Sequence, residues 1–272
     1  GLGLDLLFAA VVSESLGGGV GPTPFIAPYV MAPIAIRHAG SMSQQENYLS
    51  KIASNEFRFG VCFSEFIGKR NDAGITFSDK VLNGRAMFAL DADDATHLLL
   101  ADEKGQIFVV DTKSANIEIV KLTTVDKTRQ YSEVICKNLE AELLENSSDS
   151  TNSINQAIDA GRIMLAADSL GASQTMIDKA VDYAKERKQF GRAIGSFQAV
   201  KHMCAEMAAD LEPCYALVWH AAHCHDHSPA EARLMACHAK AHVSEKRKVI
   251  AKKAIEVHGG MGFTDLLGLH YW

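Results

Sequence analysis

The sequence predicts an α+β protein of several domains, in which helices come first, short β-strands occupy the middle and long helices follow. Apolar residues recur at helical spacing in residues 4–16 and again, over longer stretches, in residues 154–258. Between them, residues 59–137 carry short runs rich in β-branched and aromatic residues, separated by turn residues. We therefore expect three regions, with boundaries at 1–57, 58–145 and 146–272.

The composition is that of an ordinary globular chain, and it excludes several classes of function. Of the 272 residues, 47% are hydrophobic and 22% charged, with a formal net charge of -6. This mild acidity offers no basic surface for nucleic acid or for an anionic membrane. The apolar stretch 27–36 is interrupted by proline and too short to cross a bilayer. The six cysteines form no Cys-x-x-Cys pair, which favours free thiols and a cytoplasmic location.

The first region is expected to contain short helices joined by tight turns. A run rich in glycine and proline at residues 17–24 ends the first helix, and Pro28 starts a second helix that reaches residue 38. Ser43, with Glu46 three residues later, has the form of a capping box before a third helix.

The middle region predicts an all-β unit, either a small barrel or a sandwich. Strand-like runs cover residues 59–63, 96–100, 107–110, 117–122 and 131–135. Asn83-Gly84 and Lys104-Gly105 are typical of turns between strands, and the polar stretch 146–153 is typical of a linker.

Three long helices are expected after this linker, over residues 154–188, 196–226 and 229–258. Helices of about 30 residues are about 45 Å long, which suits an up-down bundle with short connections. Pro213 predicts a kink in the middle helix of the three.

Two motifs in the helical region carry a resemblance to a known family. The first is Arg-Lys-Gln-Phe-Gly-Arg-Ala-Ile-Gly-Ser-Phe-Gln at 187–198, and the second is His-Gly-Gly-Met-Gly-Phe-Thr at 258–264. Both resemble motifs of the acyl-CoA dehydrogenase family, and matches at the opening Gly-Leu-Gly-Leu, at 63–65 and at 159–188 extend the resemblance over almost the whole chain. Most of that family's N-terminal helical domain is missing, so we expect a fragment.

The resemblance implies a helical N-terminal part, a middle β-barrel and a C-terminal up-down helical bundle. It implies FAD between barrel and bundle, in a site that a neighbouring subunit completes. It further implies α,β-dehydrogenation of an acyl-CoA thioester, in which a carboxylate removes the α-proton and the flavin takes the β-hydrogen as hydride. The electron acceptor that the resemblance implies is an electron-transfer flavoprotein.

Several residues match the family's cofactor and substrate positions. The positions implied to contact FAD are Arg187, Gln189, Phe190, Gln198, Glu256, Gly259, Gly260, Phe63, Ser64 and Phe88. Arg187 suits the pyrophosphate because its guanidinium stays charged and can bind two oxygens at once. Asp159 and Arg162 match residues that hold the CoA part of the substrate. Each phenylalanine, taken alone, would be interpreted as a core residue.

Departures from the family pattern concern the catalytic base and the flavin. One family base position lies beyond Trp272 and the other aligns with Gly161, which cannot remove a proton, so the catalytic residue is unknown. Leu90 replaces a Thr that bonds the flavin, Glu256 replaces a Gln, and residues 66–72 replace a glycine-rich loop. The last residues resemble short-tailed subunits of heteromeric dehydrogenases, including those that act on sterol side chains.

Three hypotheses are consistent with these matches and departures. The first is one subunit of a heteromeric acyl-CoA dehydrogenase in lipid or sterol side-chain breakdown, whose partner supplies the base. The second is a homomeric enzyme whose base lies outside this sequence. The third is a flavin-free structural subunit that stabilises an active partner.

A dense set of metal-ligand residue types also occurs in the sequence. It comprises His220, His223, Cys224, His225 and His227. Imidazoles on one helix face suit Zn or Ni. A solvated helix end explains the set more simply, so the sequence predicts no metal site.

Overall fold

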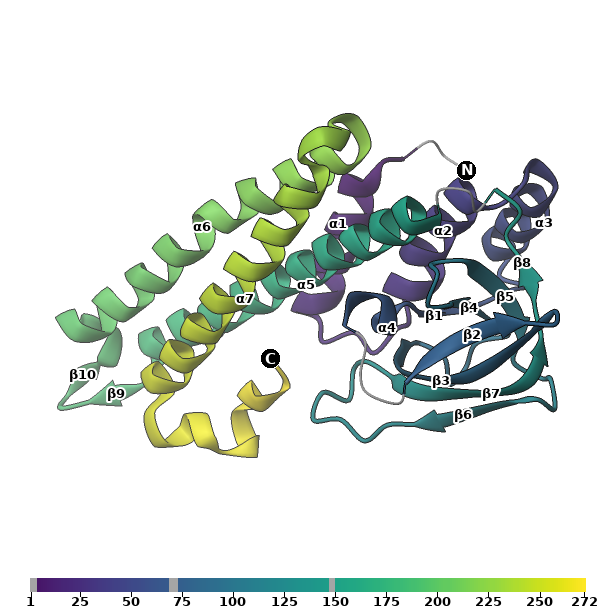
Figure 1. The fold of residues 1–272 in the computed structure, drawn as a ribbon. Helices are drawn as coiled ribbons and strands as arrows, with labels where there is room; N and C mark the ends of the chain where they lie inside the picture. Colours follow the sequence, from purple (N-terminus) through teal and green to yellow (C-terminus); the bar gives the residue numbers. More distant parts are fainter. Residues whose placement is uncertain (1–3, 69–72, 147–149) are drawn as a thin grey trace. The chain divides into compact units, whose positions relative to one another are not determined.

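The chain folds into two compact units in a computed structural model that describes residues 4–68, 73–146 and 150–272 (Figure 1). The first unit spans residues 22–161, and the second combines the segment up to residue 21 with residues 162–272. Helix α5 (Ser150–Glu186) begins in the first unit and ends in the second. The predicted boundaries at 1–57, 58–145 and 146–272 stay a prediction, and the matched residues 1–3 and 69–72 lie outside the described residues.

The first unit opens with two helical segments that correspond to the predicted short helices. A π-helical turn (Ala27–Met31) runs directly into α2 (Ala32–Ala39), and α3 (Met42–Ala53) follows. The capping box of α3 is formed by Ser41 and Gln44, so the predicted pair Ser43 and Glu46 was wrong by two residues. Gln44 is held in this register because its side chain also donates to the carboxylate of Glu142 at 2.7 Å.

The middle of the chain forms one mixed sheet. Its strands are β1 (Phe59–Cys62), β2 (Gly74–Ser78), β3 (Val81–Leu90), β4 (His97–Ala101), β5 (Ile107–Asp111), β6 (Ile117–Lys121), β7 (Tyr131–Glu140) and β8 (Glu142–Leu143). They pair in the order β6-β7-β3-β1-β4-β5-β8, with β2 on β3, and only the β1–β4 pairing is parallel among the described strands. The implied closed barrel is not observed in the described part of the chain. The strands at the two ends explain this, since β8 has two residues and β6 is largely exposed.

The turn predicted at Asn83-Gly84 was wrong, because both residues lie inside β3. The tight turn instead consists of Asp79 and Lys80, both in the left-handed region, which joins β2 to β3 as a two-residue hairpin. Gly84 has φ 120°, and a side chain there would overlap the carbonyl oxygen of Gly74 on β2. The pair therefore marks an irregularity in a strand. The turn at Lys104-Gly105 is confirmed.

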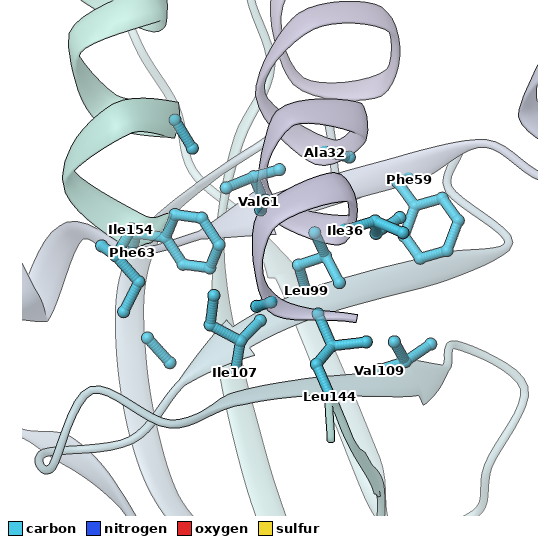
Figure 2. Packing of buried hydrophobic residues seen from close by; sticks show 14 of the residues in the cluster. Ala32, Ile36, Phe59, Val61, Phe63, Leu99, Ile107, Val109, Leu144 and Ile154 are labelled. Atoms are coloured by element: carbon cyan, nitrogen blue, oxygen red, sulfur yellow. The ribbon is translucent and has the colours of Figure 1, made fainter. Parts of the chain in front are cut away.

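The core of the first unit lies between α2 and one face of the sheet (Figure 2). Ala32 and Ile36 of α2 pack toward strand residues of β1, β4 and β5, and Ile154 of α5 closes the same cluster. The buried strand residues in it are Phe59, Val61, Leu99, Ile107 and Val109, together with Phe63 directly after β1 and Leu144 after β8. The short helix before the strands is thus fixed by apolar burial.

The second unit is built from long helices, as predicted. It contains α1 (Leu6–Gly18), most of α5, α6 (Gln198–His227) and α7 (Pro229–His258). The linker prediction was wrong for residues 150–153, which already belong to α5, and residues 147–149 lie outside the described residues. Pro213 lies inside α6, which continues on both sides of it. Among the residues described, none of the helices has the length and apolar character that a membrane crossing needs.

Helices α1 and α5 cross with their backbones in contact. A side chain at Gly171 would overlap the carbonyl oxygen of Glu14, and one at Gly17 would overlap that of Asp168. The crossing is further bound by the Ser13 hydroxyl, which donates to the carbonyl of Met164 at 2.8 Å in the buried interior. Only glycine allows so close an approach, so these positions fix how α1 lies on α5.

Candidate cofactor site

The first matched motif folds as an exposed hairpin, which we call the arm (residues 187–198). Strands β9 (Lys188–Gln189) and β10 (Arg192–Ala193) pair through a two-residue turn made of Phe190 and Gly191. Phe190 has φ 55° and is 92% exposed. A left-handed aromatic residue is costly, and such backbone strain is typical of functional sites. Arg187, Gln189 and Gln198 are exposed along the same arm.

Local contacts keep the arm in one shape. The ring of Phe197 meets Phe190 edge-on at 6.1 Å and carries the guanidinium of Arg192 4.0 Å above its centroid. Where the arm returns to the helices, a side chain at Gly195 would lie 2.9 Å from the carbonyl oxygen of Ala184. The arm is therefore pressed against α5, and its polar side chains remain available at the surface.

The second matched motif begins at His258, the last residue of α7, and continues as a short 3-10 helix (Gly259–Phe263). Gly259 has φ 59° and ψ -141°, a conformation that essentially only glycine adopts, and it ends α7. At both Gly259 and Gly260 an added Cβ would meet no described atom within 4 Å, and both residues are exposed. Open space over a glycine backbone can admit a closely packed ligand. Glu256 is exposed in the last turn before these glycines.

The structure brings the two motifs to the same end of α5. The backbone carbonyl of Tyr183 accepts from the N–H of Arg187 at 2.8 Å, where the arm begins. The ring of Tyr183 lies against that of His258, next to Gly259, with the centroids 4.5 Å apart and the planes tilted by 30°. His258 is buried, and its Nδ1 lies 2.7 Å from the carbonyl of Ala254. Sequence reasoning gave no role to Tyr183 or His258, because nothing in their spacing indicates that the two rings meet.

The matched residues of the first unit form a separate set. The Ser64 hydroxyl donates to the carbonyl of Met87, next to Phe88. Phe88 has φ 59° at a bulge of β3 and is 51% exposed. The interpretation of Phe88 as a core residue was therefore wrong. Phe63 is a core residue, because its side chain is 3% exposed and packs within the cluster of Figure 2. Leu90 is half-buried against that cluster, and its side chain offers no hydrogen-bond donor.

Helix α5 carries the residues matched to substrate and base. Asp159 is buried, Arg162 is half-buried, and the two lie about one turn apart on the helix. A Cβ at Gly161 would lie 2.9 Å from the Sδ atom of Met31. The Met31 side chain occupies the space next to Gly161, so a carboxylate at this position would require that side chain to move.

A cleft of about 260 Å³ in the first unit contains a carboxyl group that sequence reasoning missed. Asp91 lies in this cleft near Tyr29 and Arg58, and it has a left-handed φ of 56°. Burial raises the pKa of the Asp91 carboxyl to about 6, although the backbone N–H of Ala27 and the charge of Arg129 act in the opposite direction. The group is therefore partly protonated near neutral pH.

Asp91→Asn is expected to stabilise the protein only at higher pH. Because the folded pKa of about 6 lies above the ordinary 3.8, the folded state binds the proton more tightly. The wild type therefore loses stability as the pH rises between these values, and Asn, which also tolerates a left-handed backbone, does not. We expect thermal denaturation at about pH 8 to show a gain of about 1–3 kcal/mol that falls to about 0.5 kcal/mol or less at about pH 4.

The exposed carboxylate of Asp94, in the same cleft, provides the matched control. Asp94→Asn should change the melting temperature equally little at both pH values. A loss of stability in Asp91→Asn at high pH would contradict the assignment, since it would mean that the Asp91 carboxylate is ionised and well bonded.

Comparison with known proteins adds independent information. A family model described as "Acyl-CoA dehydrogenase, C-terminal domain" matches residues 151–271. The caffeyl-CoA reductase-Etf complex subunit CarC of Acetobacterium woodii is 32% identical over 269 residues, which cover 90% of this chain and 69% of the relative. The acyl-CoA dehydrogenase IpdE2 of Mycobacterium tuberculosis is 28% identical over 272 residues, covering 100% of this chain and 72% of the relative.

Solved structures show the same fold. A glutaryl-coenzyme A dehydrogenase in complex with glutaryl-CoA superposes with a TM-score of 0.88 at 23% identity, covering 100% of this chain and 75% of that chain. The steroid ACAD Tcur3481-Tcur3483 variant superposes with a TM-score of 0.82 at 25% identity, covering 97% of this chain and 74% of that chain.

Proposed function

The chain belongs to the acyl-CoA dehydrogenase family, and from that premise we propose that it is one subunit of a heteromeric, FAD-dependent dehydrogenase that acts on an acyl-CoA thioester. The observation that carries the proposal is a contrast within the chain. The exposed arm and the open turn at Gly259 and Gly260, which we call the glycine turn, lie at one end of α5, whereas Met31 occupies the space next to Gly161, the position matched to the catalytic base. Such a chain can hold a dinucleotide without supplying the base.

The residues of the arm and of the glycine turn suit a dinucleotide. The guanidinium of Arg187 is exposed and would pair with the pyrophosphate, and the amides of Gln189 and Gln198 would add hydrogen bonds. The backbone at Gly259 and Gly260 leaves room for close packing. FAD, when bound, accepts the β-hydrogen of the acyl group as hydride. The exposed carboxylate of Glu256 would face such an anion unfavourably unless a cation pairs with it.

The residues matched to the flavin ring and to the catalytic base suit FAD less well than the arm does, which favours a site shared with a partner chain. The side chain of Leu90 cannot donate a hydrogen bond to a flavin, and Gly161 cannot remove the α-proton. We infer that the partner chain supplies the base and the contacts to the reacting ring. Asp159 and Arg162 would then help to position the CoA part of the substrate. In this arrangement the chain binds and orients, and the partner carries out the proton transfer.

The relatives support the proposed partners and substrates. CarC is by name a subunit of a reductase-Etf complex, which supports an electron-transfer flavoprotein as the redox partner of this chain. The steroid ACAD supports a lipid or sterol side-chain acyl-CoA as substrate, and a cytoplasmic location stays part of the proposal. A second candidate function is a flavin-free subunit that stabilises an active partner. Leu90 and the packing of Met31 on Gly161 favour that candidate.

The FAD content of the purified protein tests the proposal. We expect little FAD on the chain alone and one FAD per unlike pair after co-expression with a dehydrogenase partner, measured by visible absorption. Arg187→Ala should lower the FAD affinity of the pair about tenfold, or about 1.4 kcal/mol, because the guanidinium that would bind the pyrophosphate is lost. Arg233→Ala, which removes an exposed arginine of α7 outside the arm, is the matched control.

Each alternative gives a different result. One FAD per chain with acyl-CoA oxidation by the chain alone would contradict the heteromeric assignment and support a homomeric enzyme. An active pair whose FAD content does not respond to Arg187→Ala would favour the structural subunit.

A further inference from the structure

Three metal-ligand side chains meet where α6 turns into α7, within the second unit. They are His220 and Cys224 from the last turns of α6 and Glu231 from the first turn of α7. Their ligand atoms all lie within 4.8 Å of one another, and the Cys224 Sγ atom lies 3.4 Å from Nε2 of His220. Three different donor types therefore converge on one point.

The short connection between the helices produces this convergence. His220 and Cys224 are four residues apart, so they share a face of α6. The chain then reverses through Ser228 alone, whose N–H donates to the carbonyl of Cys224 at 2.8 Å. The N–H of Glu231 donates in turn to the carbonyl of Ser228 at 3.0 Å. The first turn of α7 is thereby held against the end of α6, and Glu231 lies close to Cys224.

We propose that His220, Cys224 and Glu231 bind a divalent transition-metal ion of the zinc class. A thiolate, an imidazole and a carboxylate are the donors that Zn²⁺ takes, and their two negative charges would balance the ion. With ordinary bond lengths, neighbouring donors around tetrahedral zinc are about 3.3–3.6 Å apart, which the Cys224–His220 distance already matches. Rotation of the exposed Glu231 side chain would bring its carboxylate oxygen to the same distance from the other two donors.

The environment of Cys224 also suits a cation. Its side chain is 1% exposed, while His220 and Glu231 are exposed, so an ion would enter from the surface and a water molecule would complete the tetrahedron. A divalent cation between the thiolate of Cys224 and the carboxylate of Glu231 would neutralise both negative charges.

The other members of the histidine set are engaged elsewhere. The rings of His223 and His227 contact each other, with the centroids 4.7 Å apart and the planes tilted by 41°. His225 contacts Asp226 at 3.1 Å, and the carboxylate of Asp226 accepts from the N–H of Leu6 at 2.7 Å. These contacts tie α1 to the end of α6. The metal would link the end of α6 to the start of α7, and this structural role does not depend on a flavin.

Cobalt binding to the purified protein tests the site. After removal of metal with a chelator, Co²⁺ titration is expected to give one equivalent bound, with an intense near-ultraviolet band that reports a thiolate ligand, and Zn²⁺ should displace it. Cys224→Ser should abolish the band. His220→Gln and Glu231→Gln, at exposed positions that do not threaten folding, should each weaken binding at least about tenfold.

Controls separate this site from adventitious binding. Two variants should keep the wild-type Co²⁺ affinity and the thiolate band. They are Cys237→Ser, which changes a cysteine of α7 outside the site, and His223→Gln, which changes one ring of the neighbouring imidazole pair. The proposal is overturned if the wild type binds no stoichiometric Co²⁺. It is equally overturned if binding persists in His220→Gln and Glu231→Gln, or is lost in His223→Gln instead.

Discussion

Gly171→Ala is expected to lower the free energy of unfolding by about 3 kcal/mol or more. The new methyl group would overlap the carbonyl oxygen of Glu14 and lie 2.8 Å from the backbone N of Gly18. Both are backbone atoms of α1, so no side chain can rotate away, and α1 must lift from α5. For a domain of this size the change corresponds to a melting temperature lower by roughly 6–12 °C, measurable by circular dichroism.

Gly19→Ala supplies the matched control for this crossing. An added Cβ at Gly19 would meet the carbonyl oxygen of Ser15 at 3.5 Å, which is ordinary contact. We expect its melting temperature to stay within about 2 °C of the wild type. A Gly171→Ala protein as stable as Gly19→Ala would contradict the close crossing of α1 and α5.

The helical part of the fold could be predicted from sequence because its signals are local. Apolar periodicity placed all three long helices, and the structure ends α7 at the predicted residue, His258. The capping box was misplaced because Ser41 and Ser43 have similar local surroundings. What selects Ser41 is the bond from Gln44 to Glu142, a residue about a hundred positions away. Tertiary contacts of this kind leave no local signal.

The sheet was harder to predict for the same reason. Strands β2 and β3 contain Gly84 and other weak strand formers, and their pairing compensates for these residues. Asn83-Gly84 is a typical hairpin pair, yet Asp79 and Lys80 form the turn. Closure of the sheet depends on how far its edge strands extend, which composition does not encode.

The candidate site shows the same division between motif and context. The arm and the glycine turn were found from their motifs, and the structure brings them to one end of α5 as continuous, exposed segments. The contacts that define the site lie outside the motifs. Each of these contacts joins residues from different helices: the ring of Tyr183 lies against His258, Met31 packs on Gly161, and Glu231 lies close to Cys224.

Gly260→Ala is expected to separate ligand binding from stability at the glycine turn. No described atom lies within 4 Å of the added Cβ, and the backbone there does not require glycine, so the melting temperature should change by less than about 2 °C. If FAD packs on this turn, as the proposed function requires, the same methyl group would intrude on the bound dinucleotide. An intrusion of this kind costs about 1–3 kcal/mol, which is roughly a 10- to 100-fold loss of FAD affinity.

The measurement compares FAD retention by the purified pair with the melting temperature of each variant. Gly19→Ala is again the matched control, because it adds a methyl group at another exposed glycine, where the new Cβ would make only ordinary contact with the carbonyl oxygen of Ser15 at 3.5 Å. That variant should keep both wild-type values. Equal FAD affinity in Gly260→Ala and Gly19→Ala would mean that the turn does not contact the cofactor. A loss of stability in Gly260→Ala would instead show that the space over the turn is filled by the protein itself, and either result would remove the glycine turn from the proposed site.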